Sequence, residues 1–593
     1  MLKCINKNLE NCLIKGFLYM LKFNIKKQTT IVKQAILDCK RAFIFAFIFS
    51  FAINLMTLAM PIYSLQILDR VISSGSTETL LALSLIITII FICLGCLTAI
   101  RSFVFTQISK KLDSNLAPKI FRSSISISCI QKSSIGSQML RDFSVVKGFF
   151  TGQIIHTLFD APWAIVFIAV IFFIHPINGF IVLSAALILL VMAFLNELVT
   201  KNKLNSANEA SVESFGKAEL ATRNAETIEA MGMKRNILKD WQNSNNSSVD
   251  LQVQANNKSV AISSITKSLR LFIQMVIMGV GAMLVLKRQM TGGGIIATSI
   301  LAGKALAPFE AGIATWKSLI SARKCYNRLK ISLENTPERE TGMPLPEPNG
   351  DIIAEKLFFA HPGSKEPIIK GINFKINAGE IIGIIGPSGA GKTTLAKLLT
   401  GIHKPSSGVV RLDNADIYKW NRDNLGKHIG YLSQDIELFS GSIKKNIARL
   451  DEEPLPEDII KASQLANAHE LILTMPNAYE TEIGLAGSSL SAGQKQRIAL
   501  ARAFYGKPKL IILDEPNSHL DQAGEVSLAK ALLHAKENKI TTIIIGHRPS
   551  VLSNVDKIMV IQAGTIQIFD DRDTVIQKFS QANTTNIQPG DPR

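Results

Sequence analysis

Long apolar runs fill much of the first half of the chain and come in three pairs. Each run approaches the roughly 20 residues that an α-helix needs to cross about 30 Å of hydrocarbon. The pattern therefore predicts an all-α transmembrane domain of six helices over residues 42–334. The expected spans are residues 42–63, 80–100, 155–174, 179–195, 271–286 and 295–309.

Two kinds of polar segment connect these runs. The short loops within the pairs hold only Arg70, Lys287 and Arg288 as basic residues, and the third loop contains the turn-like Gly292–Gly294. The segments between pairs, residues 101–154 and 196–270, are long, rich in Lys and Arg, and poor in helix breakers. By the positive-inside rule, we expect both termini and both long segments in the cytoplasm, with helices continuing into the long segments.

Composition supports a membrane protein, with 47% hydrophobic and 19% charged residues. Residues 1–41 hold nine Lys and Arg against two acidic residues. We therefore interpret them as a cytoplasmic basic segment at anionic membrane lipid and expect no nucleic-acid partner, despite a formal charge of +18. The seven cysteines lack the spacing of a metal site, and Cys93 and Cys96 are interpreted as packing residues.

The second half of the chain changes character after a Pro-rich linker at residues 335–350. Short β-branched runs at residues 381–385, 510–513 and 541–545 alternate with helical patterns, as buried parallel strands do. We expect a soluble α/β domain over residues 351–580, followed by a polar tail at 581–593.

A phosphate-binding motif, GxxxxGK[ST], occupies residues 386–393, between an expected strand and an expected helix. In this arrangement backbone N–H groups and the helix N-terminus bind the phosphates of ATP, Lys392 reaches the β- and γ-phosphates, and Thr393 binds Mg²⁺. The α/β domain is thus predicted to be a P-loop nucleotide-binding domain. The candidate contacts of this phosphate loop are Gly386, Ser388, Gly389, Gly391, Lys392, Thr393 and Thr394.

A second candidate lies where the apolar run 510–513 ends in two carboxylates, Asp514 and Glu515. Asp514 is suited to hold Mg²⁺, and Glu515 is suited to orient and deprotonate the attacking water. An apolar run followed by two acids is common by itself. Its place after the phosphate loop makes it the expected second half of an ATPase site.

The segment Leu490-Ser491-Ala492-Gly493-Gln494 resembles the signature of ABC ATPases, with Ala where Gly is commonest. The resemblance implies that Ser491, Gly493 and Gln494 contact the γ-phosphate held by the other subunit of a dimer. It also implies roles for residues outside the signature. Gln434 resembles the glutamine that joins metal and catalytic site, Asp521 the D-loop aspartate, and His547 the switch histidine. His361 takes the place of the aromatic residue that stacks on adenine, with Phe359 as the alternative.

The membrane half resembles the type I secretion ATPases, in the branch that exports proteases and RTX proteins. The resemblance lies in residues 61–74, 140–142, 159–163, 175–176, 229–233, 307–310 and 515–518. It implies a homodimeric ABC exporter of the inner membrane that drives an unfolded protein out of the cytoplasm. The implied partners are a membrane-fusion adaptor and an outer-membrane duct.

Two other functions remain open. A lipid or hydrophobic-drug exporter shares every nucleotide motif, whereas a non-pumping channel or nucleotide sensor shares the fold but commonly lacks catalytic residues. Two charges in membrane segments also have alternative interpretations. Asp160 is either functional or solvated at a helix end, and Lys304 either lines the transport path, reaches the lipid surface or pairs with Glu310.

Overall fold

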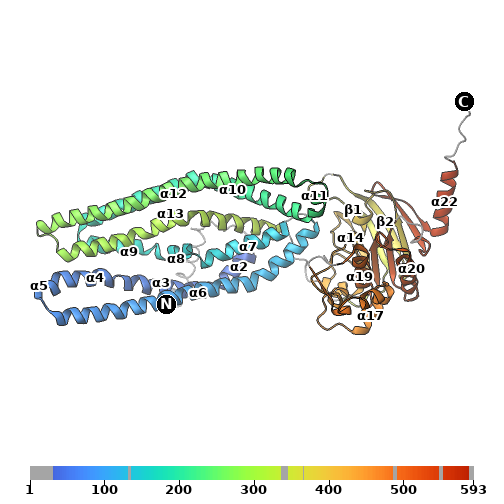
Figure 1. Ribbon diagram of the computed structural model, residues 1–593, viewed down its shortest axis with the longest axis horizontal. Coiled ribbons are helices and arrows are strands. Elements are labelled where there is room, and N and C mark those ends of the chain that lie inside the picture. The colour runs from blue at the N-terminus through green and yellow to red at the C-terminus, as the bar shows by residue number, and fades with distance from the viewer. Residues whose placement is uncertain are drawn as a thin grey trace, which may run out of the picture. The chain divides into compact units, whose positions relative to one another are not determined.

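The computed structural model describes residues 31–130, 135–335, 345–364, 366–484, 490–546 and 552–585. The chain divides into two compact units, Met1–Pro337 and Glu338–Arg593. The first is helical throughout its described part, and the second combines helices with β-sheets (Figure 1). This is the predicted order of an all-α membrane domain followed by an α/β domain.

Long helices build the first unit. In its described residues five helical stretches are long and apolar enough to cross a membrane, and α8 with α9 forms a sixth if this pair, bent by 43°, is one span. The bend falls at Pro162, as expected for a residue that interrupts helix hydrogen bonding. The elements are α2 (Ile31–Asp38), α3 (Lys40–Thr57), α4 (Ala59–Gln66), the π-helical η1 (Ile67–Val71), α5 (Ile72–Ser74), α6 (Thr77–Ile130), α7 (Ile135–Thr151), α8 (Gln153–Asp160), α9 (Trp163–Ile174), α10 (Pro176–Arg223), α11 (Ala225–Ala230), α12 (Lys234–Leu286) and α13 (Gly292–Asn335).

Two of the short loops contain helix starts. The glycines expected to form a turn are instead the first residues of α13, where the N–H of Gly293 donates to Asp69 at 2.9 Å. A Cβ atom at position 293 would lie 2.8 Å from the carbonyl oxygen of Leu65 in α4. Glycine therefore allows the start of α13 to pack closely against α4. At the start of α10, His175 Nδ1 accepts from the N–H of Ile177, and Pro176 occupies the first turn.

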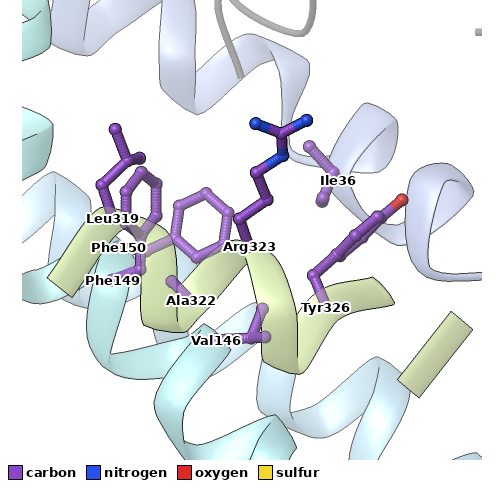
Figure 2. A pocket seen from close by; sticks show the side chains of 8 residues that line it. All are labelled: Ile36, Val146, Phe149, Phe150, Leu319, Ala322, Arg323 and Tyr326. Atoms are coloured by element: carbon purple, nitrogen blue, oxygen red, sulfur yellow. The ribbon is translucent and has the colours of Figure 1, made fainter. Parts of the chain in front are cut away.

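The N-terminal helix α2 belongs to the core of the membrane unit. Val32, Ala35 and Ile36 are buried in a cluster shared with α6, α7 and α13, so the apolar face of α2 packs against these helices. Ile36 also closes a cavity of about 20 Å³ beside Phe149. Figure 2 shows the rings of α7 and the side chains of α13 around this cavity. Residues 1–30 lie outside the described part of the chain.

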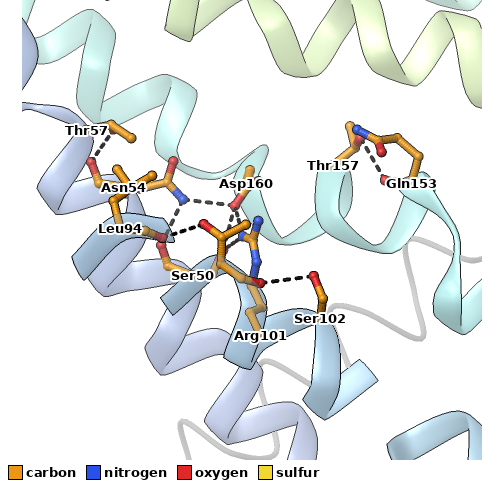
Figure 3. A network of polar contacts seen from close by, with 10 residues as sticks. Ser50, Asn54, Thr57, Leu94, Arg101, Ser102, Gln153, Thr157 and Asp160 are labelled. Carbon is orange, nitrogen blue, oxygen red and sulfur yellow. Dashed lines mark hydrogen bonds and ion pairs between the residues drawn. The ribbon is translucent and has the colours of Figure 1, made fainter. Parts of the chain in front are cut away.

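Asp160 and Glu310 in the membrane unit are each paired with an arginine of another helix. Asp160 accepts from Ser50 at 2.6 Å, from Asn54 at 2.9 Å and from Arg101 at 2.7 Å, so it is not merely solvated at a helix end (Figure 3). Glu310 pairs with Arg270 at 2.8 Å and not with Lys304, a pair that was one of the three alternatives for Lys304. Lys304 itself is exposed on α13.

Two larger sheets form the frame of the second unit. One has the strand order β2-β1-β4-β5, and the other has the order β12-β11-β3-β10-β9-β6, parallel from β11 to β6. The elements are β1 (Ile352–Phe359), β2 (Ile369–Ile376), β3 (Ile381–Ile385), α14 (Lys392–Leu399), β4 (Ser407–Leu412), β5 (Ala415–Asp416), α15 (Arg422–Leu425), η2 (Gly426–His428), β6 (Ile429–Leu432), β7 (Gly441–Ser442), α16 (Ile443–Ile447), α17 (Pro456–Leu465), α18 (His469–Leu473), η3 (Ala478–Glu480), β8 (Glu482–Ile483), α19 (Ala492–Phe504), β9 (Leu510–Asp514), α20 (Gln522–Glu537), β10 (Thr541–Ile545), β11 (Lys557–Gln562), β12 (Thr565–Asp571) and α22 (Arg572–Thr585).

The expected strands coincide with β3, β9 and β10, which lie side by side in the parallel sheet. β9 and β10 are fully buried, which explains their apolar runs Leu510–Leu513 and Ile543–Ile545. Two expected boundaries differ from the structure. Helix α13 ends at Asn335, within the expected linker, and α22 continues to Thr585, beyond the expected start of the polar tail.

Candidate nucleotide-binding site

The carboxyl ends of four adjacent parallel strands define the site. In their registers Ile384 lies opposite Ile545, Ile545 opposite Asp514, and Leu432 opposite Leu513. The phosphate loop, the two carboxylates and Gln434 therefore follow strands that end at the same edge of the sheet. Ligands of open α/β sheets bind at this edge.

Glycine makes the shape of the phosphate loop possible. Gly386, Gly389 and Gly391 have φ angles of 156°, 79° and 101°, where side chains are disfavoured. A side chain at Gly386 would also collide with the carbonyl oxygen of Ile561. The loop ends at Lys392, the first residue of α14, so its N–H groups and the helix N-terminus surround a position suited to an anion.

Lys392 is buried within the curve of this loop. Its ammonium donates to the carbonyl oxygens of Gly386 at 2.8 Å and Pro387 at 2.9 Å. Burial lowers the pKa of Lys392, while the carboxylates of Glu515 and Asp514 act in the opposite direction. Ser388 is exposed in the loop, and Thr393 and Thr394 are half-buried in the first turn of α14.

Asp514 has the features of a cation ligand. It is 1% exposed, and neither carboxylate oxygen has a hydrogen-bond partner among the described residues. Burial and the neighbouring Glu515 carboxylate raise the pKa of Asp514, whereas the Lys392 ammonium favours its charged form. A buried carboxylate without a partner is costly, and oxygen ligands of this kind suit Mg²⁺. The chemistry of Thr393 and Asp514 therefore fits the metal.

Glu515 follows the strand in an unusual backbone conformation. Its φ of 52° is unusual for a side chain of this size, and its N–H donates to Ile545 at 2.9 Å. Strained backbone of this kind persists where neighbouring groups hold it. In this site the neighbouring group is the side chain of Gln496.

Gln496 is fully buried on α19 and was not singled out from the sequence. Its amide N–H₂ donates to the carbonyl oxygens of Pro516 and Glu515, and its oxygen accepts from the N–H of His519 at 2.8 Å. The helix that begins after the signature thus holds the loop that carries Glu515. A glutamine within a helix gives no sequence signal for this contact, which joins segments distant in the chain.

The signature residues cap α19. Ser491 Oγ accepts from the N–H of Gln494, and Gln494 Oε1 accepts from the N–H of Ser491 at 2.9 Å, forming a capping box. A side chain at Gly493 would lie 3.1 Å from the carbonyl oxygen of His519. Asp521 caps α20 through Gly524 and pairs with Arg497 at 2.7 Å. Asp521 thereby has structural partners within its own unit.

For two residues predicted from the sequence, Gln434 and His547, the structure gives no direct contact with the phosphate loop among the described residues. Gln434 is exposed just after β6, at the correct edge of the sheet. His547 lies outside the described residues, although Gly546 before it donates to Ile384 at 3.3 Å and so brings the chain beside the phosphate loop's strand.

The aromatic alternatives for adenine differ sharply in exposure. Phe359 is 5% exposed, and its ring stacks on His403 with a centroid distance of 5.0 Å. His361 is exposed. The structure therefore leaves the His361 ring, rather than that of Phe359, accessible to a base.

Comparisons with known proteins agree with this geometry. The ABC transporter family matches residues 369–518, and the ABC transporter transmembrane region matches residues 43–306. The chain is 37% identical over 543 residues to the type I secretion system ATP-binding protein PrsD of Rhizobium meliloti (strain 1021), covering 91% of this chain and 93% of that protein. It is 28% identical to the leukotoxin translocation ATP-binding protein LktB of Mannheimia haemolytica, covering 90% of this chain and 76% of that protein.

The fold is similar to that of a bacterial Atm1-family ABC exporter solved with ATP bound. The TM-score is 0.76 at 18% identity, and the match covers 93% of this chain and 99% of that one. The helical spans make the protein a multi-pass membrane protein. The chain therefore belongs to the ABC transporters, in their group of type I secretion system ATP-binding proteins, and is an ATPase that couples ATP hydrolysis to transport.

Proposed function

We propose that this protein exports an unfolded protein across the inner membrane, as the ATP-driven component of a type I secretion system. The observation that carries the proposal is the 37% identity to PrsD over 91% of the chain, together with a phosphate loop and carboxylates suited to hydrolysis. The nucleotide unit and both termini would lie in the cytoplasm. This placement rests on the distribution of Lys and Arg between long and short connecting segments.

The residues at the edge of the parallel sheet have separate roles in ATP hydrolysis. The phosphate loop and Lys392 bind the β- and γ-phosphates, and Glu515 receives the proton of the attacking water. Thr393, Gln434 and Asp514 would hold Mg²⁺, which neutralises phosphate charge when bound. His361 would stack on adenine, and His547 would orient the γ-phosphate.

A homodimer completes the site. Ser491 is exposed at the N-terminus of α19, and no hydrogen bond joins the signature to the phosphate loop within the described part of the unit. One chain has one nucleotide unit, so a second copy supplies the opposite signature. Two ATP molecules would lie between the copies, and hydrolysis would separate them and move the membrane helices.

The open face of α13 supports a polar cargo over a lipid. Lys304 lies twelve residues after the start of α13, or about 18 Å along the helix, and is exposed. Between Ile296 and Ile331 this helix exposes no large hydrophobic side chain, whereas α6 exposes many. A charge at this depth normally faces an aqueous path or a protein partner. The proposed partners outside this membrane are a membrane-fusion adaptor and an outer-membrane duct.

Comparing secreted proteins from cells that carry the wild type, Glu515→Gln or Glu537→Gln tests the cargo. Glu537 is an exposed residue at the end of α20 and provides a matched carboxylate-to-amide control. We expect the Glu515→Gln cells alone to lose one or more secreted proteins. An unchanged set of secreted proteins with altered membrane lipids would favour a lipid exporter instead. If Glu515→Gln abolished the ATPase activity of the wild type but changed neither secreted proteins nor lipids, the result would favour a nucleotide sensor.

A further inference from the structure

Two buried rings lie behind the exposed His361. Phe359 is the last residue of β1, and His403 lies in the loop after α14. Their rings are nearly parallel, with 14° between planes, and the two residues are 5% and 4% exposed. Neither ring is open enough to receive a base. Their position next to His361 gives them a different use.

The His361 ring is perpendicular to both. It makes an angle of 80° with Phe359 at a centroid distance of 5.4 Å and an angle of 90° with His403 at 6.1 Å. Perpendicular contacts at these distances are favourable arrangements of aromatic rings. The buried pair therefore determines how the exposed imidazole is turned, because a rotated His361 would lose both contacts.

The same loop is connected to the phosphate site. The N–H of His403 donates to the carbonyl oxygen of Lys397 at 3.1 Å, in the last turn of α14. Arg422 donates to the carbonyl oxygen of Thr400 at 2.6 Å and further fixes this turn. Helix α14 thus carries the phosphate-binding Lys392 at one end and the ring pair's support at the other.

We propose that His403 is a positioning residue for the nucleotide base. Stacked on Phe359, it holds the His361 imidazole in the orientation that presents its free face to adenine. This inference rests on the proposed stacking role of His361. His403 itself would contact neither the base nor the phosphates. It would act through the His361 ring, which contacts the base. Burial, with Lys397 and His361 nearby, lowers the pKa of His403 to about 4, so the stacked ring is neutral.

The expected effect is on binding and not on the chemical step. An interaction made equally in the ground state and the transition state changes KM and leaves kcat unaltered. We expect His403→Leu to raise the KM for ATP about five-fold with kcat within about two-fold of the wild type. His403→Phe keeps a flat ring and should restore KM. Phe359→Leu removes the other ring of the pair and should act like His403→Leu.

The experiment measures ATPase kinetics of the full chain in detergent or lipid, with inhibition by inorganic tripolyphosphate. Tripolyphosphate has no base, so its inhibition constant should be the same in wild type and His403→Leu. Phe374→Leu is the matched control, because Phe374 belongs to another ring pair of the same unit, with Phe569 at 6.2 Å. It should leave the KM unchanged, and thermal unfolding verifies that each variant is folded.

The outcomes separate this inference from the role of His361. If His361→Ala raises the KM for ATP, the stacking role of His361 holds. An unchanged KM in both His403→Leu and Phe359→Leu would then overturn the inference about His403. An unchanged KM in His361→Ala would overturn the proposed stacking itself. Equal weakening of ATP and tripolyphosphate in His403→Leu would also contradict a positioning role, because it would show a disturbed phosphate loop.

Discussion

Arg101 Nη1 lies 2.7 Å from Asp160 Oδ1, and this ion pair joins α6 to the last residue of α8 inside the membrane unit. The Arg101 side chain is 7% exposed. Ser50 also contacts both charged groups, at 2.9 Å from Arg101 and 2.6 Å from Asp160. The bent span resumes as α9 only three residues later, so the pair joins α6 to the chain directly before the bend at Pro162.

We expect Asp160→Asn to destabilise the protein by roughly 2–4 kcal/mol, because it leaves the buried Arg101 without a counter-charge. The value falls toward the lower side of the range for buried pairs, since the Asp160 side chain retains 29% exposure. Thermal unfolding in detergent would measure the loss, and transport should decline with it.

Asp113→Asn is the matched control for this change. Asp113, on α6, also forms an ion pair with a neighbouring helix, through Lys147 of α7 at 2.8 Å, but the two side chains are 45% and 38% exposed. Exposed pairs contribute about 0–1 kcal/mol, so this variant should unfold close to the wild type. Equal destabilisation by both substitutions would remove the special role of the buried pair.

Glu515→Gln should leave ATP binding nearly unchanged and reduce kcat by at least about 100-fold, as expected on loss of a general base. The amide keeps the size of the side chain and the backbone contact to Ile545. Binding and turnover measured on the same preparation would separate the two effects. Turnover near that of the wild type would assign the base to another residue.

Shared sites between two copies can be tested with two inactive variants. Lys392→Ala damages the phosphate loop, and Ser491→Arg damages the signature. If each site combines one loop with the opposite signature, a mixed dimer has one intact site and one doubly damaged site. Where one site suffices, each mixed dimer should therefore regain up to about half of the wild-type activity. An equal mixture, in which about half of the dimers are mixed, should regain up to about a quarter. Activity no higher than in either variant alone would contradict independent shared sites.

The order of elements could be predicted from the sequence because its signals are local. The length of apolar runs, the buried strands and the phosphate motif each depend on neighbouring residues. The turn expected at Gly292–Gly294 was wrong because its glycines begin a helix whose N–H is bound by Asp69. That contact spans 224 positions and leaves no local pattern.

The same distinction holds for the candidate site, where only residues in local motifs could be predicted. Lys392 and Asp514 follow from motifs, whereas Gln496 and His403 act through contacts that only the fold creates. Helix α2 shows the same limit. Its apolar residues Val32, Ala35 and Ile36 pack into the core of the membrane unit, a contact that the basic charge of residues 1–41 does not predict.

The neutral, buried His403 also gives the nucleotide unit a dependence on pH. The pKa of His403 is lowered to about 4, first by burial and then by Lys397 and His361. An exposed histidine has a pKa of about 6.5, so the unfolded chain takes up a proton that the folded chain excludes. The stabilising effect of the neutral ring is therefore complete above about pH 6.5 and decreases as the pH falls toward 4.

Replacing His403 with Phe should remove this part of the pH dependence. Between about pH 6.5 and pH 5, the wild type should lose on the order of 2 kcal/mol more stability than His403→Phe, because one proton is linked to unfolding at about 1.4 kcal/mol per pH unit. Thermal unfolding of both proteins in detergent at the two pH values would measure the difference. Carboxylates elsewhere titrate alike in the two proteins, so their contribution cancels. Parallel loss of stability in both proteins would mean that His403 is protonated in the folded chain, and its stacked ring would then be charged rather than neutral.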